Sequence, residues 1–390
     1  MVSIQEALEI IEKNISSVNR EIIPIEDAIG RVLARDYIAN YDLPRFNNSA
    51  MDGFAVKVSD SGKVIEVENV IYAGDRVEDV EVREGFGVRI MTGAVTPKGC
   101  EAIVPIEDVE ELSGNKIKIP DGITLNSMVR FRGEDIKSGE KFLSKHQQLN
   151  GYSLSLLASQ GVTHIEVFRR VRVIIFSTGE ELKPHYEKIE PHQLYNSNSL
   201  MFHGRAKELG CDVTYLTIAK DTIDSLKELI RESLNADLIL TSGGISVGDR
   251  DYTLQAFKDV GMDILFSKVD IKPGKPTTFG KIGELAVVNL PGNPLASAVN
   301  FEMFVKPAIL KLSGLSGDSQ KVKAKLRDDI ILKREKDTVI LGYFDGEYFT
   351  KVEPQKPGMI SPLGRFNAIV RTSRTINKGE QIYIVLLRDF

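Results

Sequence analysis

Between residues 171 and 315, short apolar runs alternate with amphipathic helices, and this alternation limits the possible folds more than any other feature of the sequence. The runs "VRVIIF" (171–176) and "DLILTS" (237–242) are typical of strands that are buried on both faces. Between them, "TIDSLKELIRESLN" (222–235) has its apolar residues at helical spacing. Such alternation predicts a parallel, doubly wound sheet.

The sequence pattern on each side of this segment predicts different secondary structure. Before it, "VIYAGDRVEDVEVREGFGVRIMTGA" (70–94) and "CEAIVPIEDVEELSGNKIKIP" (100–120) read as short strands and turns, and the segments that flank them look helical. We therefore expect a β-rich lobe inserted into a helical part. After residue 318, short runs of strand-forming residues predict a small barrel or sandwich. A chain of 390 residues is long enough for several such domains.

Composition narrows the function and the compartment. A net charge of −5 gives no support to nucleic-acid binding, which usually needs a basic excess. The two cysteines, Cys100 and Cys211, stand far apart, which excludes a disulfide framework and a Cys-rich metal site. Glutamates interrupt the first apolar residues, so these do not form a signal peptide, and no apolar run is long enough to span a bilayer. We therefore expect a soluble, cytoplasmic protein.

The unusual residues of the predicted α/β domain follow its strands. They lie in "STGEEL" (177–182), "AKD" (219–221), "SGGISVGDRD" (242–251), "KVDIKPGKP" (268–276) and "LPGNP" (290–294). Ligands of open α/β sheets bind at the carboxyl ends of the strands, which form one rim. A glycine in a single turn often serves only packing, but five such turns on one rim favour a ligand site.

Two kinds of chemistry share this rim. One set would suit oxyanions through cations and backbone N–H groups: Lys268, Lys272, Lys275, Gly243, Gly244, Gly274 and Gly292. The other set consists of carboxylates suited to Mg²⁺: Glu181, Asp221, Asp249 and Asp251. For any one of these residues alone, a salt bridge on a solvated rim is the simpler interpretation, and Asp221 could simply cap the helix that follows it.

The N-terminal half adds a second set of polar turns. They are "LPRFNNSAMDGFAV" (43–56), "MTGA" (91–94) and "RGEDIKSGE" (132–140). Their chemically reactive side chains are Asp52, Thr92 and Asp135. On composition alone, hairpin turns explain these stretches equally well.

Taken together, the motifs resemble the molybdopterin molybdenumtransferase family, which includes MoeA and the E-domains of plant and animal proteins such as gephyrin. "NSAMDGFAV", "MTGA", "RGEDI", "FSTGEEL", "TSGGISVGD", "IKPGKP" and "LPGNP" occur in the family's order and at its spacing over nearly the whole chain. The resemblance implies an α/β and β multidomain protein. Its parts would be an elongated helical domain (1–45 and 140–170), an inserted β-rich lobe (46–139), an α/β molybdopterin-binding domain (171–315) and a C-terminal β-barrel (318–390).

The resemblance also implies a reaction. Molybdate, or tungstate, would be inserted into the dithiolene of adenylylated molybdopterin, with Mg²⁺-dependent release of AMP. The family forms homodimers whose cleft lies between the α/β domain of one subunit and the β-rich lobe of the other. A molybdopterin adenylyltransferase and the apoproteins of molybdoenzymes would then be possible partners.

Carried over residue by residue, the resemblance names the site. The positions that match the family's functional residues are Asp52, Thr92, Asp135, Glu181, Asp221, Asp251, Lys268, Lys272, Lys275, Pro291 and Pro294. Glu181, Asp221 and Asp251 would hold Mg²⁺ on the pyrophosphate, and Lys272 and Lys275 would bind molybdate. The "TSGGISVG" turn would hold the phosphate end of molybdopterin through Ser242, Gly243, Gly244 and Ser246. Asp249 and Gly292, which lie nearby, would also bind the cofactor.

Two departures and two rival functions remain. Asn47 and Asn196 stand where the family usually has aspartates, which could weaken Mg²⁺ binding. The α/β domain also resembles molybdopterin adenylyltransferases, but the long N-terminal half and the C-terminal domain argue against that enzyme. A non-catalytic carrier or scaffold is the other rival, and the retained rim residues favour catalysis over it.

Overall fold

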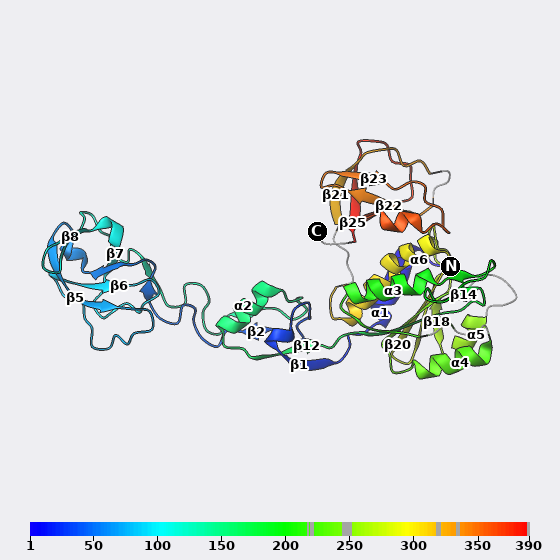
Figure 1. Cartoon of the computed structure of the whole chain (residues 1–390), viewed down its shortest axis with the longest axis horizontal. Helices are drawn as coiled ribbons and strands as arrows, with labels where there is room; N and C mark the ends of the chain where they lie inside the picture. The colour runs from blue at the N-terminus through cyan, green and yellow to red at the C-terminus, as the bar shows by residue number, and fades with distance from the viewer. Residues whose placement is uncertain (217, 219–221, 244–251, 317–320, 333–335, 388–390) are drawn as a thin grey trace. The chain divides into compact units, whose positions relative to one another are not determined.

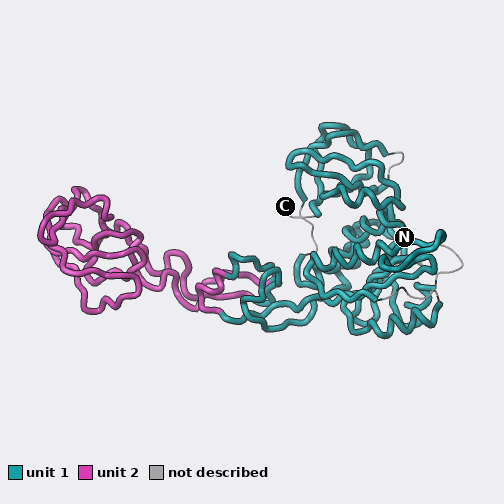
Figure 2. Tube along the Cα trace, in the orientation of Figure 1, with its two compact units in different colours: residues 1–35, 146–154, 163–390 teal, residues 36–145, 155–162 magenta. Residues whose placement is uncertain are grey.

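The structure is a computed structural model, and its chain forms two compact units (Figure 2). It describes residues 1–390 except 217, 219–221, 244–251, 317–320, 333–335 and 388–390. Unit 1 comprises residues 1–35, 146–154 and 163–390, and unit 2 comprises residues 36–145 and 155–162. No helix among the described residues is long and apolar enough to cross a membrane.

Unit 1 is built on a six-stranded sheet with the order β16-β13-β17-β20-β19-β18 (Figure 1). Its strands are β13 (Arg172–Ser177), β16 (Asp212–Tyr215), β17 (Leu238–Ser242), β18 (Asp263–Phe266), β19 (Thr278–Ile282) and β20 (Leu285–Leu290). The predicted parallel pairing is confirmed for β16, β13, β17 and β20. Strand β19 is instead antiparallel to both of its neighbours, because only Gly283 and Glu284 join it to β20 and a link that short makes a hairpin.

Helices cover both faces of this sheet because the side chains of its strands alternate between two cores. Val173 and Ile175 face the core that includes residues of α1, α3, α6 and α7, whereas Phe176 faces the core of α4 and α5 (Figure 1). The helices are α1 (Ile4–Asn14), α3 (Ser197–Glu208), α4 (Ile223–Glu232), α5 (Tyr252–Asp259), α6 (Pro294–Asn300) and α7 (Lys306–Leu312). The predicted last helix is confirmed, with one π-helical turn, Phe301–Val305, between α6 and α7.

The C-terminal part of unit 1 is a closed five-stranded barrel, which confirms the predicted β-barrel. Its strands are β21 (Lys321–Leu326), β22 (Thr338–Phe344), β23 (Tyr348–Lys351), β24 (Ala368–Thr372) and β25 (Gln381–Leu386), with a 3₁₀ turn at Ser361–Gly364. One of the links between the barrel and the α/β part is made by Lys272 in the β18–β19 loop. Lys272 N–H donates to the Asp337 carbonyl (2.9 Å), and Val339 N–H donates to the Lys272 carbonyl (2.8 Å).

Two shorter strand pairs complete the described part of unit 1. Strand β1 (Arg20–Pro24), followed by a 3₁₀ turn at Ile25–Asp27, pairs with β12 (His164–Phe168). Strand β14 (Leu182–Lys183) pairs with β15 (Leu194–Tyr195) beside the edge where β13 ends.

Unit 2 carries a six-stranded mixed sheet with the order β7-β4-β6-β5-β9-β8. Its strands are β4 (Gly53–Val56), β5 (Val64–Ile71), β6 (Phe86–Ile90), β7 (Ala102–Pro105), β8 (Glu110–Leu112) and β9 (Lys116–Lys118), with 3₁₀ turns at Val58–Asp60 and Ile106–Asp108. These strands confirm the β-rich lobe, while the domain bounds drawn from the sequence stay predictions.

The segments on either side of the lobe are less helical than the sequence suggests. In residues 1–45 and 140–170 the described helices are α1 and α2 (Gly151–Ser159), and α2 is divided between the two units. Short strand pairs occupy much of the remainder: β1 with β12, β2 (Tyr37–Ile38) with β11 (Lys141–Leu143), and, next to the lobe, β3 (Asn48–Ser49) with β10 (Val129–Arg130). Runs of two to five residues are too short for periodicity to separate strand from helix.

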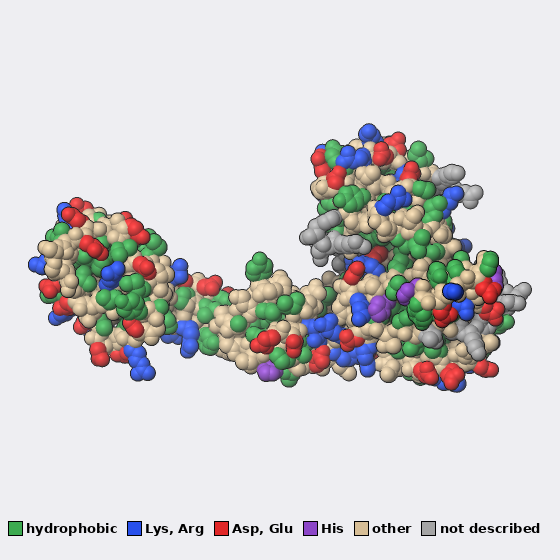
Figure 3. Space-filling model, in the orientation of Figure 1, with side chains coloured by type: hydrophobic (Ala, Val, Ile, Leu, Met, Phe, Trp, Pro, Cys, Tyr) green, Lys and Arg blue, Asp and Glu red, His purple; other side chains and the backbone are tan. Residues whose placement is uncertain are grey.

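Acidic and basic side chains are interspersed over the face of the molecule drawn in Figure 3. This distribution agrees with the net charge of −5. On that face, and among the described residues, no broad surface of positive charge is offered to a nucleic acid.

Candidate functional site

The carboxyl ends of β13, β17 and β20 surround a cavity of about 660 Å³ at the edge of the α/β sheet, which we call the rim cavity. Its lining includes these residues that the sequence singles out: Glu181, Ser242, Gly243, Pro291, Gly292 and Pro294. It also includes residues that the sequence reading passed over, among them Thr178, Asn198, Pro276 and Asn293. The turns after these three strands therefore line one cavity, while the ligand site and the roles of the individual residues stay predictions.

Glycines let the rim turns approach each other closely. Gly243 has a φ of +94°, and a Cβ atom there would lie 2.8 Å from the Thr178 carbonyl oxygen. A Cβ atom on Gly292 would lie 3.8 Å from the Cα of Gly243. The Gly243 N–H donates to the Leu290 carbonyl (3.3 Å), so this predicted donor already has a partner. The turns after β13, β17 and β20 therefore form one continuous backbone surface.

The two rim prolines have different structural roles. Pro294 opens helix α6, the position where a helix tolerates proline best. The Pro291 carbonyl accepts hydrogen bonds from Ser242 Oγ (3.4 Å) and from Ser297 Oγ. Ser242 was predicted to donate a hydrogen bond to phosphate. It is buried, and its hydroxyl donates instead to the Pro291 carbonyl.

Asn198 is the functional candidate that sequence reasoning missed. It lies in the first turn of α3, and its Nδ2 donates to Ser242 Oγ (2.8 Å) and to the Gly292 carbonyl (2.7 Å). It thus holds two rim turns together from a helix that is distant in sequence. Its Oδ1 is buried and has no hydrogen-bond partner among the described residues. The signal in the sequence was its place in "YNSNS", where only the first asparagine drew attention.

That first asparagine, Asn196, is a structural residue. It caps α3, with its Oδ1 accepting from the Ser199 N–H (3.2 Å) and its Nδ2 donating to the Tyr215 hydroxyl (3.2 Å). An aspartate could accept from the Ser199 N–H and from the Tyr215 hydroxyl, but it has no N–H to donate. In unit 2, Asn47 Oδ1 accepts from the Arg132 N–H (2.8 Å). Both asparagines therefore have structural roles that do not require a charged side chain.

Glu181 is the one predicted Mg²⁺ ligand that the structure describes. Its side chain is exposed, and no ion pair to it occurs among the described residues. Its carboxylate lies over Gly179, where a Cβ atom would come within 2.8 Å of both oxygens. No group of three or more possible metal ligands occurs within the part of the chain that the structure describes. The other predicted residues of this set, Asp221, Gly244, Ser246, Asp249 and Asp251, lie outside the described residues.

The three predicted lysines belong to the loop between β18 and β19. Strand β18 runs parallel to β20, so this loop begins at the same carboxyl edge as the other rim turns. The side chains of Lys268, Lys272 and Lys275 are exposed, and none forms an ion pair with a described residue. Of this loop, only Pro276 is among the residues that line the rim cavity. The three lysines therefore belong to a loop that begins at the carboxyl edge of the sheet, and they are not paired with any described acid.

Asn300 of α6 fixes the shape of this loop. Its Nδ2 donates to the Pro273 carbonyl (3.4 Å), and the single O–H of Thr277 has two acceptors within hydrogen-bond distance, Asn300 Oδ1 (2.9 Å) and the Gly274 carbonyl (3.0 Å). Gly274 has a φ of +103°, and a Cβ atom there would lie 1.6 Å from Asn300 Nδ2. Only glycine fits at this position.

In unit 2 the structure brings Asp52 and Thr92 together. The Thr92 N–H and hydroxyl both donate to Asp52 Oδ1, each at 2.7 Å. These bonds, the hydroxyl's first, lower the pKa of Asp52, with a smaller contribution from Arg89. Asp135 is separate from the pair: its backbone N–H donates to the Leu43 carbonyl (3.0 Å), and its side chain is exposed.

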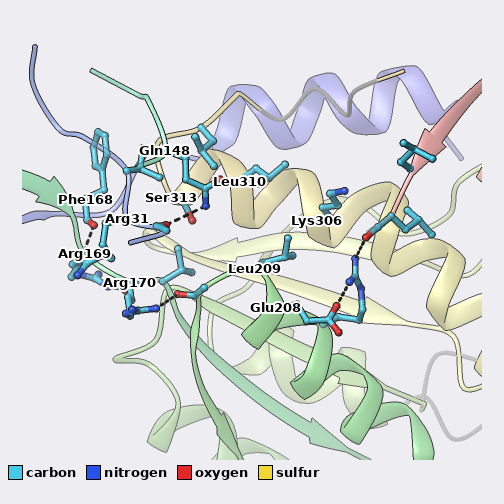
Figure 4. A pocket seen from close by; sticks show the side chains of 18 residues that line it. Arg31, Gln148, Phe168, Arg169, Arg170, Glu208, Leu209, Lys306, Leu310 and Ser313 are labelled. Carbon is cyan, nitrogen blue, oxygen red and sulfur yellow. Dashed lines mark hydrogen bonds and ion pairs between the residues drawn. The ribbon is translucent and has the colours of Figure 1, made fainter. Parts of the chain in front are cut away.

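A second cavity, of about 500 Å³, lies at the opposite, amino edge of the sheet (Figure 4). Several arginine and lysine side chains line this cavity, but most of them form ion pairs with acidic residues. Arg31 pairs with Glu21, and Arg205 pairs with Glu208 and with Glu302. Arg169 donates two hydrogen bonds to the Asp237 carboxylate, from Nη1 to Oδ2 and from Nη2 to Oδ1, each at 2.6 Å. Such pairing is typical of a structural cluster.

The two cysteines are poor nucleophiles. Burial raises the pKa of Cys100 to about 11 and the pKa of Cys211 to about 12. Both thiols stay protonated near neutral pH, so covalent catalysis through cysteine is not supported.

Comparisons with known proteins agree along the chain. The MoeA N-terminal region (domain I and II) matches residues 2–161, and a probable molybdopterin binding domain matches residues 174–311. Proteins named molybdopterin molybdenumtransferase from Staphylococcus epidermidis and Staphylococcus aureus are 34% identical over 336 residues, 84% of this chain and 80% of theirs. A molybdopterin biosynthesis MoeA protein from Pyrococcus horikoshii superimposes with a TM-score of 0.87, at 28% identity, over 99% of this chain and 100% of its own.

Proposed function

The chain belongs to the molybdopterin molybdenumtransferase (MoeA) family, and we propose that it inserts molybdate or tungstate into adenylylated molybdopterin and releases AMP. It is a transferase of molybdenum cofactor biosynthesis, and its reaction inserts molybdenum into molybdopterin. The adenylylated form of the substrate, the release of AMP and the acceptance of tungstate are inferred from the resemblance.

The rim cavity is the observation that carries the proposal. Its volume of about 660 Å³ suits a ligand of cofactor size, and its floor is a continuous backbone surface with polar side chains. Binding oxyanions requires positive charge that is not already neutralised. The exposed lysines of the β18–β19 loop meet that requirement, since they have no ion-pair partner among the described residues.

The proposed division of labour follows from these positions. Lys272 and Lys275 bind the oxyanion, because the loop between them is fixed by Asn300 and loses little entropy on binding. Lys268 adds positive charge at the same edge. The rim turns at Gly243 and Gly292 receive the phosphate end of molybdopterin. We assign no covalent nucleophile, because molybdate or water can attack directly.

Asp52 and Thr92 form the second part of the proposed site. Thr92 uses both of its donors on one carboxylate oxygen, so Asp52 stays ionised and its other oxygen is left for a ligand. In the homodimer implied by the resemblance, unit 2 of one subunit would supply this carboxylate to the rim cavity of the other. Asp135 would belong to the same part.

Magnesium, when bound, would neutralise the negative charge that develops as the phosphoanhydride breaks. Glu181 fits this role, since its carboxylate is exposed at the rim without a described ion pair. We assign Asp221 and Asp251 to the same site on the resemblance alone.

We place the protein in the cytoplasm, where a molybdopterin adenylyltransferase would supply its substrate and molybdoenzyme apoproteins would receive its product. Both cysteines are free, as suits a reducing compartment.

The test is AMP release from adenylylated molybdopterin, measured with molybdate, with tungstate, with neither, and without Mg²⁺. We expect release to need both an oxyanion and Mg²⁺, and Asp52→Ala to slow it about 100-fold. Asp75→Ala is the matched control, because Asp75 also accepts a backbone N–H in an exposed turn of unit 2 (2.8 Å from Tyr72 N). Tight molybdopterin binding without AMP release under any condition would favour a carrier or scaffold instead.

A further inference from the structure

Arg89 of β6 is a basic side chain of unit 2 whose guanidinium forms no ion pair with a described acid. The residue is half-buried, and its Nε is enclosed without an acceptor among the described residues. Its cross-strand neighbours are Phe54 of β4 and Val70 of β5, and neither of them is an acid. By contrast, the other half-buried base of unit 2, Lys57, pairs with Glu101 at 3.2 Å.

Arg89 lies beside the pair formed by Asp52 and Thr92, at the same end of the sheet of unit 2. Its partner in the ladder, Phe54, comes two residues after Asp52, and Thr92 follows Arg89 by three residues. The bonds from Thr92 are the main reason for the lowered pKa of Asp52, and the positive charge of Arg89 lowers that pKa further. The guanidinium is therefore close to Asp52 without being paired with it, and one ligand can contact both groups.

The chemistry of Arg89 suits a phosphate group. A half-buried cation without a partner is costly, because it loses part of its hydration and no anion replaces it. A bound anion would remove that cost. Arginine matches phosphate in particular, since its planar fork of N–H donors can bind two oxygens at once. Because Nε is enclosed, the outer nitrogens Nη1 and Nη2 are the donors that a ligand would contact.

The proposed reaction leaves one phosphate for this position. The oxyanion is assigned to the lysines of the β18–β19 loop, and the phosphate end of molybdopterin is assigned to the rim turns. The phosphate of AMP has no protein cation assigned to it. The neighbouring carboxylate favours the same choice, because Asp52 repels a bare oxyanion such as molybdate but can accept a hydroxyl of the ribose that carries the AMP phosphate.

We propose that Arg89 binds the phosphate of the AMP moiety, so that unit 2 contributes a binding residue in addition to Asp52 and Thr92. The inference rests on the proposed function for its choice of ligand. The same phosphate is present in the substrate and in the product, so Arg89 contacts both. Loss of such an interaction raises KM more than it lowers kcat. Arg89→Gln should therefore raise the KM for adenylylated molybdopterin about tenfold and leave kcat within about threefold.

The direct test titrates the full chain with AMP, with adenosine and with inorganic phosphate by isothermal calorimetry. Adenosine has the base and the sugar of AMP but lacks its phosphate. We expect AMP to bind at least about tenfold more tightly than adenosine. Inorganic phosphate offers no ribose hydroxyl to the carboxylate, so it should compete with AMP only weakly.

Three variants make the test specific. Arg89→Gln should weaken AMP binding about tenfold and leave adenosine binding unchanged, which also reports that the variant is folded. Arg89→Lys keeps the charge but not the fork of donors, so its affinity for AMP should lie between those of the native chain and Arg89→Gln. Arg83→Gln is the matched control, because Arg83 precedes the same strand but pairs with Glu68 at 2.8 Å. It should bind AMP as the native chain does.

Several outcomes would overturn the proposal. They are no AMP binding by the native chain, equal binding of AMP and adenosine, native AMP binding by Arg89→Gln, or the same loss of AMP binding in Arg83→Gln. Displacement of AMP by an equal concentration of inorganic phosphate would indicate a general anion site and would also count against it.

The calorimetric assay contains neither molybdopterin nor molybdate, so it fails independently of the proposed reaction. Oxyanion-dependent AMP release together with any of these outcomes would refute the role of Arg89 alone. Arg89-dependent AMP binding by a chain that never releases AMP from adenylylated molybdopterin would refute the reaction and leave the AMP site standing.

Discussion

The two edges of the α/β sheet both carry cavities with charged residues nearby, and they differ in how those charges are used. At the amino edge, Asp237 accepts two bonds from Arg169 and one from the Arg172 N–H (2.8 Å), and Arg205 is shared between two glutamates. At the carboxyl edge, Glu181 and the lysines of the β18–β19 loop have no ion-pair partner among the described residues.

The difference separates stability from function. A paired charge at a half-buried site holds the fold, because losing one partner leaves the other desolvated. An uncommitted charge adds nothing to the fold and is free for a ligand. Residues at the amino edge should therefore control unfolding, and those at the carboxyl edge should control the reaction. Three experiments sharpen this contrast.

The largest effect is expected for Lys275→Ala at the carboxyl edge. Loss of one cation that stabilises developing negative charge should slow AMP release about 100-fold. The free energy of unfolding should change by less than about 0.5 kcal/mol, because the side chain is exposed. Lys207→Ala, at an exposed position of α3, is the matched control for both measurements. A fall in stability as large as the fall in rate would erase the distinction between the edges.

Asp237→Ala should do the reverse. Its removal leaves Arg169 without its partner and should lower the free energy of unfolding, measured in urea, by about 3 kcal/mol. The rate of AMP release per folded molecule should stay within about twofold, because the residue lies at the amino end of β17. Asp212→Ala, at the exposed start of β16, is the control and should change the unfolding free energy little. A native urea midpoint for Asp237→Ala would contradict the structural assignment.

The dependence of stability on pH gives the smallest effect. Burial works to raise the pKa of Asp237, but the bonds from Arg169 and the Arg172 N–H outweigh it and leave the pKa lowered. A lowered folded pKa contributes stability that is complete above the ordinary aspartate value of about 3.9 and is lost as the pH falls toward the folded value. The native chain should therefore lose more stability below about pH 4 than Asp237→Asn does. Equal acid sensitivity of the two chains would count against the pair.

Much of this organisation could be predicted from the sequence, because it depends on local patterns. Alternating apolar runs located the parallel strands, and the turns that follow them located the rim. The strand pairing of β19 could not be predicted as easily, since it depends on a hairpin link of two residues. Asn198 was missed because its partners, Ser242 and Gly292, are 44 and 94 residues away.

The chemistry of single residues was harder to predict than their location. The sequence pattern around a lysine in a rim turn is the same whether its side chain lines the cavity or points away from it. The structure shows that Pro276, and not the lysines, lines the rim cavity. Likewise, Asn196 looked like a lost metal ligand until its cap on α3 and its bond to Tyr215 were seen. Side-chain partners of this kind are tertiary facts that one-dimensional patterns do not contain.

Molybdate titration of two double variants tests the central claim most directly. Lys272→Ala with Lys275→Ala removes two of the three lysines of the β18–β19 loop that have no ion-pair partner among the described residues. Arg170→Ala with Lys306→Ala removes the two cations of the amino-edge cavity that have no ion-pair partner among the described residues. Isothermal calorimetry should show molybdate binding lost in the first variant and native in the second. If molybdate binding survives in the lysine variant and disappears in the Arg170/Lys306 variant, the oxyanion binds at the amino edge of the sheet, which would contradict the account.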